Sequence, residues 1–156
     1  MAVSPIPAGY AGVTPYLIVH GAAKAIDFYK RAFVATELFR MPMPGDMLGH
    51  AEIKIGEGIV MLADEMPDMG HRGPQALGGT PVSLMFYVKD VDTQFARAVA
   101  AGGTVQKPLQ DQFYGDRSGT LVDPFGHVWT IATHIEDVAH DEMDRRLQKV
   151  MQSSGT

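Results

Sequence analysis

Residues 115–134, GDRSGTLVDPFGHVWTIATH, decide the fold that this sequence predicts. The stretch reads as a strand, a tight turn and a second strand. Residues 119–122 are an apolar run rich in β-formers, and residues 123–126 (DPFG) place proline second and glycine fourth in a turn. The second strand alternates, with Trp129 and Ile131 on one face. The other face carries Val128, Thr130, Ala132 and His134. The stretch therefore predicts a hairpin that turns one face toward a core.

The rest of the chain shows the order strand, helix and three strands, and shows it twice. The two helices are predicted from apolar residues at steps of three and four. A Pro- and Gly-rich stretch at 41–49 (MPMPGDMLG) predicts a loop. The predicted strands are 14–20, 36–40, 50–55, 59–63, 82–88 and 104–107, in addition to the hairpin, and the predicted helices are 22–33 and 91–101.

The two halves align on each other. Val19 lies over Val88, an offset of 69 residues, and the same offset places Ile26 over Phe95. It continues without a gap through the hairpins to the last strand of each half. Neither half is expected to bury its sheet alone. The sequence therefore predicts an α+β fold of two tandem βαβββ repeats, which form a curved eight-stranded half-barrel sheet with helices on the convex face and a concave groove.

A final helix is predicted in the C-terminal part of the chain. Asp141 is expected to cap it, and Met143, Leu147, Val150 and Met151 form a narrow apolar stripe that its own domain or a second copy must cover. The predicted organisation is a leader at 1–13, a first repeat at 14–65, a connector at 66–81, a second repeat at 82–134 and a helix with tail at 135–156, as one domain.

Composition excludes several classes of function. The net charge of −5 and the absence of a basic face argue against nucleic acid as a partner. No apolar run approaches the length that spans a membrane, and the first residues do not resemble a signal peptide. The chain has no cysteine, so thiolate catalysis, thiolate metal sites and disulfides are excluded. We expect a cytoplasmic protein with no nucleic-acid or membrane partner.

Several motifs together resemble a known family. They are AIDFYKRAF at 25–33, HAEIKIG at 50–56, FYGDRSGTLVDPFGHVW at 113–129 and ATHIEDV at 132–138. With the paired repeat, they are similar to the glyoxalase, bleomycin-resistance and dioxygenase group, the vicinal oxygen chelate superfamily, and most of all to its PhnB-like branch. The resemblance covers residues 13–138. It implies homodimers whose grooves are often completed by both subunits. The superfamily includes lyases, isomerases, dioxygenases, thiol transferases and drug-sequestering proteins, so the resemblance implies a fold rather than one activity.

The resemblance also implies where a metal would bind. Metal enzymes of the superfamily place His, Glu or Gln at four inward positions, which correspond here to Thr14, Met61, Ser83 and Thr130. None of these side chains is an imidazole or a carboxylate, the usual donors for divalent metals. We therefore expect no metal cofactor at these positions. The alternative is a divalent metal held by displaced ligands, namely His50, Glu52 and His134.

His50 and Glu52 are the candidate catalytic residues. They share one face of the predicted strand 50–55, with Lys54 beyond them, and they could form a general acid/base pair. The alternative is a solvated outer face with a Glu52–Lys54 charge pair. For His134 the alternative is a strand-end residue that bonds local backbone, and His127, after a turn glycine, is expected to be structural.

Aromatic and sulfur side chains predict an apolar groove. A groove lined in this way could stack flat ligands, whereas the alternative is that these residues are plain core. Arg117 could pair with Asp116 at the rim or meet an anionic substrate. The predicted groove residues are Tyr16, Met61, Ser83, Met85, Tyr87, Phe113, Tyr114, Arg117, Thr130 and His134.

These observations predict a glyoxalase- or bleomycin-resistance-like homodimer that binds a small molecule in its groove without the usual metal. One alternative is a metal-dependent lyase, isomerase or dioxygenase, which needs at least three converging ligands. Another is a structural or interaction module whose own loops fill the groove.

Overall fold

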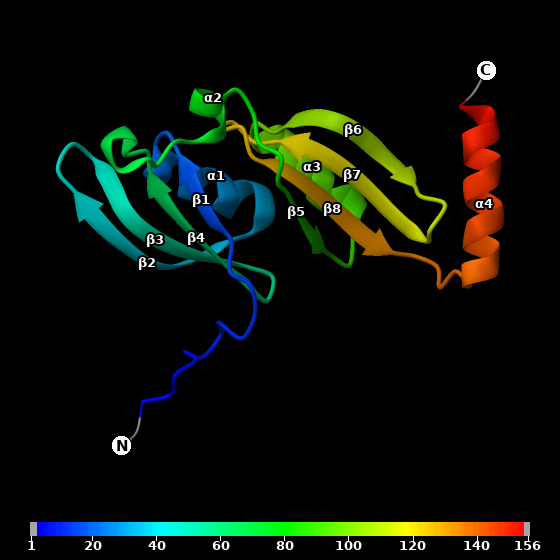
Figure 1. Cartoon of the computed structure of the whole chain (residues 1–156), viewed down its shortest axis with the longest axis horizontal. Coiled ribbons are helices and arrows are strands. Elements are labelled where there is room, and N and C mark those ends of the chain that lie inside the picture. Colours follow the sequence, from blue (N-terminus) through cyan, green and yellow to red (C-terminus); the bar gives the residue numbers. More distant parts are fainter. Residues whose placement is uncertain (1–2, 155–156) are drawn as a thin grey trace.

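The structure, a computed structural model, describes residues 3–154, so the ends of the predicted leader and tail at 1–2 and 155–156 lie outside the described residues. Its eight strands form two four-stranded sheets (Figure 1). In spatial order, sheet 1 contains β1 (Tyr16–Val19), β4 (Gly58–Asp64), β3 (Met47–Ile55) and β2 (Thr36–Met43), and sheet 2 contains β5 (Ser83–Tyr87), β8 (Val128–His134), β7 (Asp116–Val122) and β6 (Thr104–Asp111).

Each sheet carries one long helix. Helix α1 (Ala22–Phe33) packs on sheet 1, helix α3 (Val91–Ala101) packs on sheet 2, and the two helices pack against each other. We call sheet 1 with α1 module 1, and sheet 2 with α3 module 2. Two short helices, η1 (Pro67–Met69) and α2 (Pro74–Leu77), lie in the connector, and α4 (His140–Ser153) ends the described chain. The predicted pair of βαβββ repeats is confirmed, with the eight strands divided between two hydrogen-bonded sheets.

The same pairing pattern occurs in both modules. The first strand runs parallel to the last, β1 with β4 and β5 with β8, and the remaining pairs are antiparallel. The first amide of each helix also bonds a side chain at the same place in the last strand. Ala22 donates to Asp64, and Val91 donates to Thr133, which are 69 residues apart like the helices themselves. The repeat therefore extends from topology to the capping of the helices.

The expectation of a gapless repeat was wrong at the hairpins. In module 1, Glu52 pairs with Met61, and in module 2 it is Thr120 that pairs with Thr130. The offset is therefore 69 residues on the last strands and 68 on the strands before them. Four residues (55–58) separate the paired residues Lys54 and Ile59, whereas five (123–127) separate the equivalent pair Val122 and Val128. In this longer turn Asp123 accepts from two backbone amides.

Two local predictions also need correction. The predicted loop at 41–49 is mostly strand, because β2 extends to Met43 and pairs with β3, leaving only a tight turn. Pro42 is tolerated there because β2 is an edge strand. Asp141 does not cap α4: the N-cap is Ala139, which makes no side-chain bond, and Asp141 lies in the first turn.

The core is centred on aromatic side chains of both modules. Phe33 of α1 packs on Trp129 of β8 with ring centroids 4.8 Å apart, and Tyr29 lies 5.4 Å from the same indole. The buried carboxylate of Asp123 accepts from the Tyr29 hydroxyl at 2.6 Å and the Trp129 indole at 2.9 Å. His127 adds a second link, at 3.0 Å from the carbonyl oxygen of Ile18 in β1. Modules 1 and 2 are thus joined by an apolar core with a polar centre.

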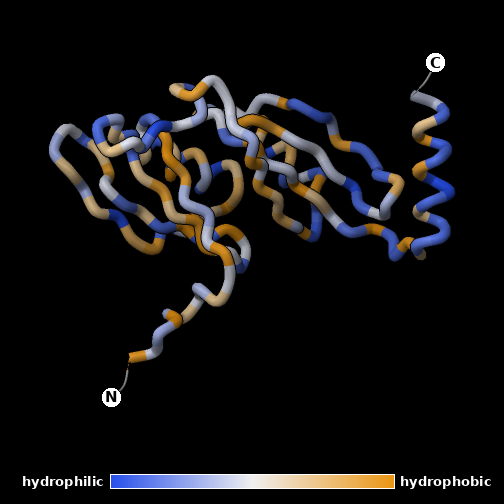
Figure 2. Tube along the Cα trace, in the orientation of Figure 1, coloured by the Kyte–Doolittle hydropathy of each residue, from blue (hydrophilic) through white to orange (hydrophobic). Residues whose placement is uncertain are grey.

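Hydropathy along the chain follows this arrangement. The apolar segments lie in the strands and in α1 and α3, whereas α4 is largely polar and stands at one end of the molecule (Figure 2). Among residues 3–154, no helix is long and apolar enough to cross a membrane.

Candidate functional site

In the described part of the chain, residues 3–154, one face of each sheet carries no helix, and we call it the open face. In sheet 1 the alternation of β3 sends Ala51 and Ile53 into the core below α1, and sends His50 and Glu52 to the open face. The strand register places Met61 beside Glu52, with Tyr16 of β1 on the other side of Met61. The prediction that His50 and Glu52 share one face of their strand is therefore confirmed, whereas their role stays a prediction.

These side chains form a continuous chain of hydrogen bonds. The Tyr16 hydroxyl lies 2.7 Å from Nδ1 of His50, and Nε2 of His50 lies 3.0 Å from Oε1 of Glu52. The other oxygen of Glu52 accepts from the hydroxyl of Tyr10 in the leader. We call Tyr10, Tyr16, His50 and Glu52 the relay cluster. Lys54 bonds Glu57 instead of Glu52, so the predicted Glu52–Lys54 pair is not the arrangement found.

The cluster fixes the charge of its carboxylate and phenols. The bond from His50, followed by the bond from Tyr10, lowers the pKa of Glu52. The bond to Glu52 raises the pKa of Tyr10. Burial, followed by the charge of Glu52, raises the pKa of Tyr16. At neutral pH the cluster therefore holds one carboxylate and two protonated phenols, and the His50 ring lies between Glu52 and Tyr16.

Sequence reasoning missed three residues of this site. Phe39 and Met41 lie opposite Glu52 and His50 across the β2–β3 ladder, and both are about half exposed, at 52% and 47%. Their alternation would have been visible if the strand had been predicted beyond residue 40. Tyr10 gave no such signal, because its contact with Glu52 depends on the path of the leader and not on any periodic pattern.

The open face of sheet 2 carries the other predicted groove residues. Met85 and Tyr87 of β5 are 48% and 59% exposed, and Thr130 of β8 bonds Thr120 of β7 at 2.9 Å. Ser83 begins β5 and is also exposed. This face therefore combines large apolar side chains with a hydroxyl pair.

A second polar cluster lies at the end of this face. Buried Asp116 accepts from the Tyr87 hydroxyl at 2.7 Å and pairs with Nδ1 of His134 at 2.7 Å. Nε2 of His134 lies 2.9 Å from Asp137. Bonds to Asp137 and then to Asp116 raise the pKa of His134. His134 thus bonds carboxylates, and not local backbone as the sequence alternative held.

We predict that His134→Gln loses stability in a pH-dependent way. Because the pKa of His134 is raised in the folded state, its ion pairs stabilise the fold fully below the unfolded pKa of about 6.5, and this contribution is lost as the pH rises through the folded value. The difference in melting temperature between wild type and variant should be largest near pH 5.5 and shrink toward pH 8.5. A difference that grows with pH would contradict this assignment.

The structure places the remaining groove candidates elsewhere. Arg117 lies on the helix-bearing face of sheet 2, where it binds Asp92 of α3 at 2.8 Å and Asp111 of β6 at 3.0 Å. Arg117 therefore does not pair with Asp116, and it does not lie on the open face. Phe113 and Tyr114 pack edge to face, with ring centroids 5.3 Å apart. Their loop, before β7, lies at the end of the sheet nearest α4.

The donors do not fit the superfamily's metal site. The mapped positions Met61 and Thr130 occupy equivalent places in the two sheets, next to Tyr16 and Met85, and offer a thioether and a hydroxyl. Thr14 and Ser83 add two more hydroxyls. Within residues 3–154, no three His, Cys, Asp or Glu side chains are grouped as metal ligands. His134 bonds Asp116 and Asp137 while His50 bonds Glu52, so the predicted displaced set does not converge in one chain.

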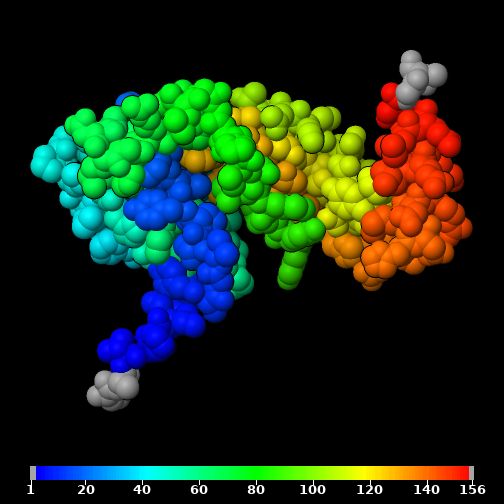
Figure 3. Space-filling model, in the orientation of Figure 1, coloured from blue at the N-terminus to red at the C-terminus, as the bar shows by residue number. Residues whose placement is uncertain are grey.

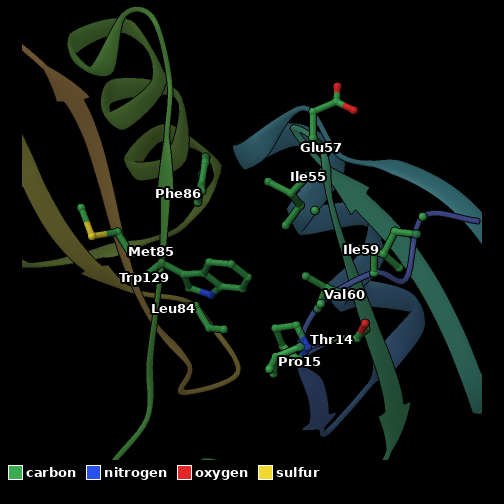
Figure 4. A pocket seen from close by; sticks show the side chains of 15 residues that line it. Thr14, Pro15, Ile55, Glu57, Ile59, Val60, Leu84, Met85, Phe86 and Trp129 are labelled. Carbon is green, nitrogen blue, oxygen red and sulfur yellow. The ribbon is translucent and has the colours of Figure 1, made fainter. Parts of the chain in front are cut away.

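An apolar cavity of about 380 Å³ lies where the two modules meet. Leu84, Phe86 and Trp129 line it from module 2, and Ile55 and Val60 face them from module 1 (Figure 4). Leader residues close one side, and the surface is hollowed between module 1 and β5 (Figure 3). Of the predicted groove residues, only Met85 lines this cavity, so it is distinct from the relay cluster.

Known proteins share this architecture. The family model of the Glyoxalase/Bleomycin resistance protein/Dioxygenase superfamily matches residues 11–131. Protein Mb0911c of Mycobacterium bovis is 45% identical over 158 residues, covering 99% of both chains. The crystal structure of TioX from Micromonospora sp. ML1 is 27% identical with a TM-score of 0.62, covering 83% of this chain and 100% of TioX.

The PhnB-like part of the resemblance also has a structural counterpart. The PhnB protein from Bacillus cereus, at 20% identity and a TM-score of 0.62, covers 78% of this chain and 98% of its own, and shares the fold. With the family model matching most of the sequence and the paired βαβββ modules in place, the chain belongs to the glyoxalase/bleomycin resistance protein/dioxygenase superfamily.

Proposed function

We propose that this protein binds a flat small molecule on its open sheet faces without the superfamily's usual metal. The observation that carries the proposal is the combination on sheet 1 of exposed aromatic and thioether side chains with a hydrogen-bonded polar cluster. Tyr16, Phe39 and Met41 are each about half exposed there, and α1 packs on the opposite face. A few placed polar groups within an apolar lining are typical of ligand sites.

The open face of sheet 2 supplies the second half of the proposed surface. Tyr87 presents an exposed ring whose hydroxyl donates to buried Asp116. Met85, two residues earlier in β5, lies on the same face. A ring held in this way loses little conformational freedom when a ligand stacks on it. This supports binding by a prepared surface.

We predict that Tyr87→Ala weakens ligand binding by about tenfold or more, since an aromatic stacking partner is lost. The measurement is a thermal-shift screen of flat aromatic compounds, neutral and anionic, followed by calorimetric titration of each compound that raises the melting temperature. Val99→Ala, an exposed change on helix α3, is the control and should leave affinity unchanged. Equal affinities in wild type and Tyr87→Ala would remove sheet 2 from the site.

The proposed binding unit is a homodimer. The stripe formed by Leu147, Val150 and Met151 on α4 is 39%, 43% and 67% exposed, and none of the described residues of α4 is buried. Arg146 of α4 bonds Glu136 in the segment before the helix at 2.7 Å and the Phe113 carbonyl in the loop before β7 at 3.4 Å. Sedimentation equilibrium should give twice the mass of the chain, and Leu147→Asp should shift it toward the monomer. A monomeric wild type would remove the second copy from the proposal.

The alternative from the sequence, a metal-dependent lyase, isomerase or dioxygenase, makes a different prediction. Zn, Ni, Mn and Fe(II) should leave the melting temperature of the dialysed protein unchanged under our proposal, because no set of donors in the described chain suits them. A stoichiometric, concentration-dependent rise would favour the metal enzyme instead.

A further inference from the structure

We propose that the relay cluster on sheet 1 is a proton-transfer site, in which Tyr16 exchanges a proton with a flat, weakly acidic O–H or C–H compound while His50 takes up the proton that Tyr16 releases. The inference rests on the proposed small-molecule function and adds a reaction and a substrate class to it. It places Tyr16 against the substrate, with His50 and Glu52 behind it.

The order of the cluster follows from hydrogen-bond chemistry. An ionised carboxylate only accepts, so Nε2 of His50, 3.0 Å from Glu52, must carry a proton. In the neutral imidazole Nδ1 is then the acceptor, and it lies 2.7 Å from the Tyr16 hydroxyl, which donates. A reactive hydroxyl, a base and a group that orients the base thus stand in line, as in activated hydroxyl sites.

The charges in the cluster restrict how it can act. The pKa of Tyr16 is raised by burial and by Glu52, so Tyr16 is not a standing phenolate at neutral pH. It can accept a substrate proton only by giving its own to His50. An imidazole is the side chain that ordinarily gains a proton between pH 5 and 8, and Glu52 stabilises the cation that results. The second acceptor position of Glu52 is occupied by Tyr10, which keeps its carboxylate aligned with His50.

The step balances without any further reagent. The substrate's O–H or C–H bond breaks, its proton bonds to Oη of Tyr16, and the proton that Tyr16 held bonds to Nδ1 of His50. The bonding pair stays on the substrate, which becomes an anion next to a newly formed imidazolium. No electron is gained from or lost to another molecule. The reverse step returns the proton to the substrate, so the site suits an isomerisation or an exchange.

The surroundings of His50 define the substrate class. The leader contributes Tyr10, β1 contributes Tyr16, and β3 contributes Glu52 and Lys54, whose ammonium bonds Glu57 in the turn that follows β3. From β2 and β4 the same face receives Phe39, Met41 and Met61, which carry no titratable group. The centroid of the Phe39 ring lies 6.2 Å from the centroid of the His50 ring. These apolar neighbours favour a flat, uncharged molecule that becomes negative only when its proton leaves.

The test uses p-nitrophenol, a flat weak acid whose anion absorbs near 400 nm. Its ionisation is titrated from pH 5 to 9, free and with saturating protein. We expect wild type to lower the apparent pKa of the bound probe by about one unit, because the imidazolium and Tyr16 stabilise its anion. Tyr16→Phe, His50→Gln and Glu52→Gln should still bind it and lose this shift. His20→Gln, an exposed histidine outside the cluster, should keep it.

Each outcome decides between the two proposals. Binding without a shift in wild type, or an equal shift in Tyr16→Phe, overturns the relay and leaves small-molecule binding intact. Failure of the probe to bind overturns phenols as the substrate class, while the screen with Tyr87→Ala judges the groove separately. Nitrogen NMR of His50 in the full protein adds a reading that needs no ligand: a proton on Nε2 supports the relay, and a neutral ring with its proton on Nδ1 overturns it.

Discussion

Asp123→Ala is expected to destabilise the protein by about 3–5 kcal/mol, lowering the melting temperature by roughly 10 °C for a chain of this size. The carboxylate is buried and accepts four bonds, from the Tyr29 hydroxyl, the Trp129 indole and the backbone amides of Phe125 and His127. Alanine leaves all four donors buried without an acceptor. Because Tyr29 belongs to module 1 and the other three donors to module 2, the loss affects the turn and the junction together.

Graded variants separate these contributions. Asp123→Asn keeps one oxygen for the two amides but sets an amide donor against the other donors, so it should fall between wild type and alanine. Tyr29→Phe removes one donor and should cost about 1 kcal/mol. Asp144→Ala on polar helix α4 is the matched control and should stay within about 0.5 kcal/mol of wild type. Urea unfolding measures all four, and an Asp123→Ala protein as stable as this control would refute the role of Asp123.

Gly119→Ala is expected to cost about 3 kcal/mol by overpacking the core. Gly119 lies in β7 beneath α3, and a Cβ built there would stand 2.7 Å from the Phe95 ring. The ring is 6% exposed and packed in the core, so α3 would have to shift away from sheet 2. Urea unfolding and melting temperature measure the loss.

A second substitution tests the cause. Phe95→Leu shortens the side chain that the new methyl group meets, so the double variant should be more stable than the sum of the two single effects, by about 1–2 kcal/mol. Gly12→Ala is the matched glycine control, since a Cβ at Gly12 meets nothing within 4 Å. Strict additivity of Gly119→Ala and Phe95→Leu would show that the clash is not the source of the loss.

Much of the fold could be predicted because it depends on local periodicity. Helices at 22–33 and 91–101 were predicted with the bounds that the structure has, since their apolar stripes are short-range signals, and Gly102 marks the end of the second helix. The strand ends were less accurate. Prolines and glycines at 41–49 predicted a loop, yet an edge strand accepts Pro42, and edge position is a property of the sheet and not of the segment.

The candidate site was less predictable, for a related reason. Alternation was enough to place His50 and Glu52 on one face, but it did not reveal that Tyr16 on a neighbouring strand would complete the chain of bonds. Arg117 was assigned to the groove on chemistry alone, although its parity along β7 is that of Gly119, which faces α3. The contact of Tyr10 depends on how an irregular segment crosses the sheet, and no pattern in the sequence encodes that path.

The one-residue difference between the two hairpins shows that the two modules of this chain differ in length as well as in sequence. At equivalent places, module 1 carries His50 and Glu52, and module 2 carries Ser118 and Thr120. In an assembly of two identical single-repeat chains, every substitution would appear in both copies of the repeat. A fused pair escapes that symmetry, so sheet 1 alone can carry the proposed proton transfer while sheet 2 is free to vary for the proposed ligand contacts.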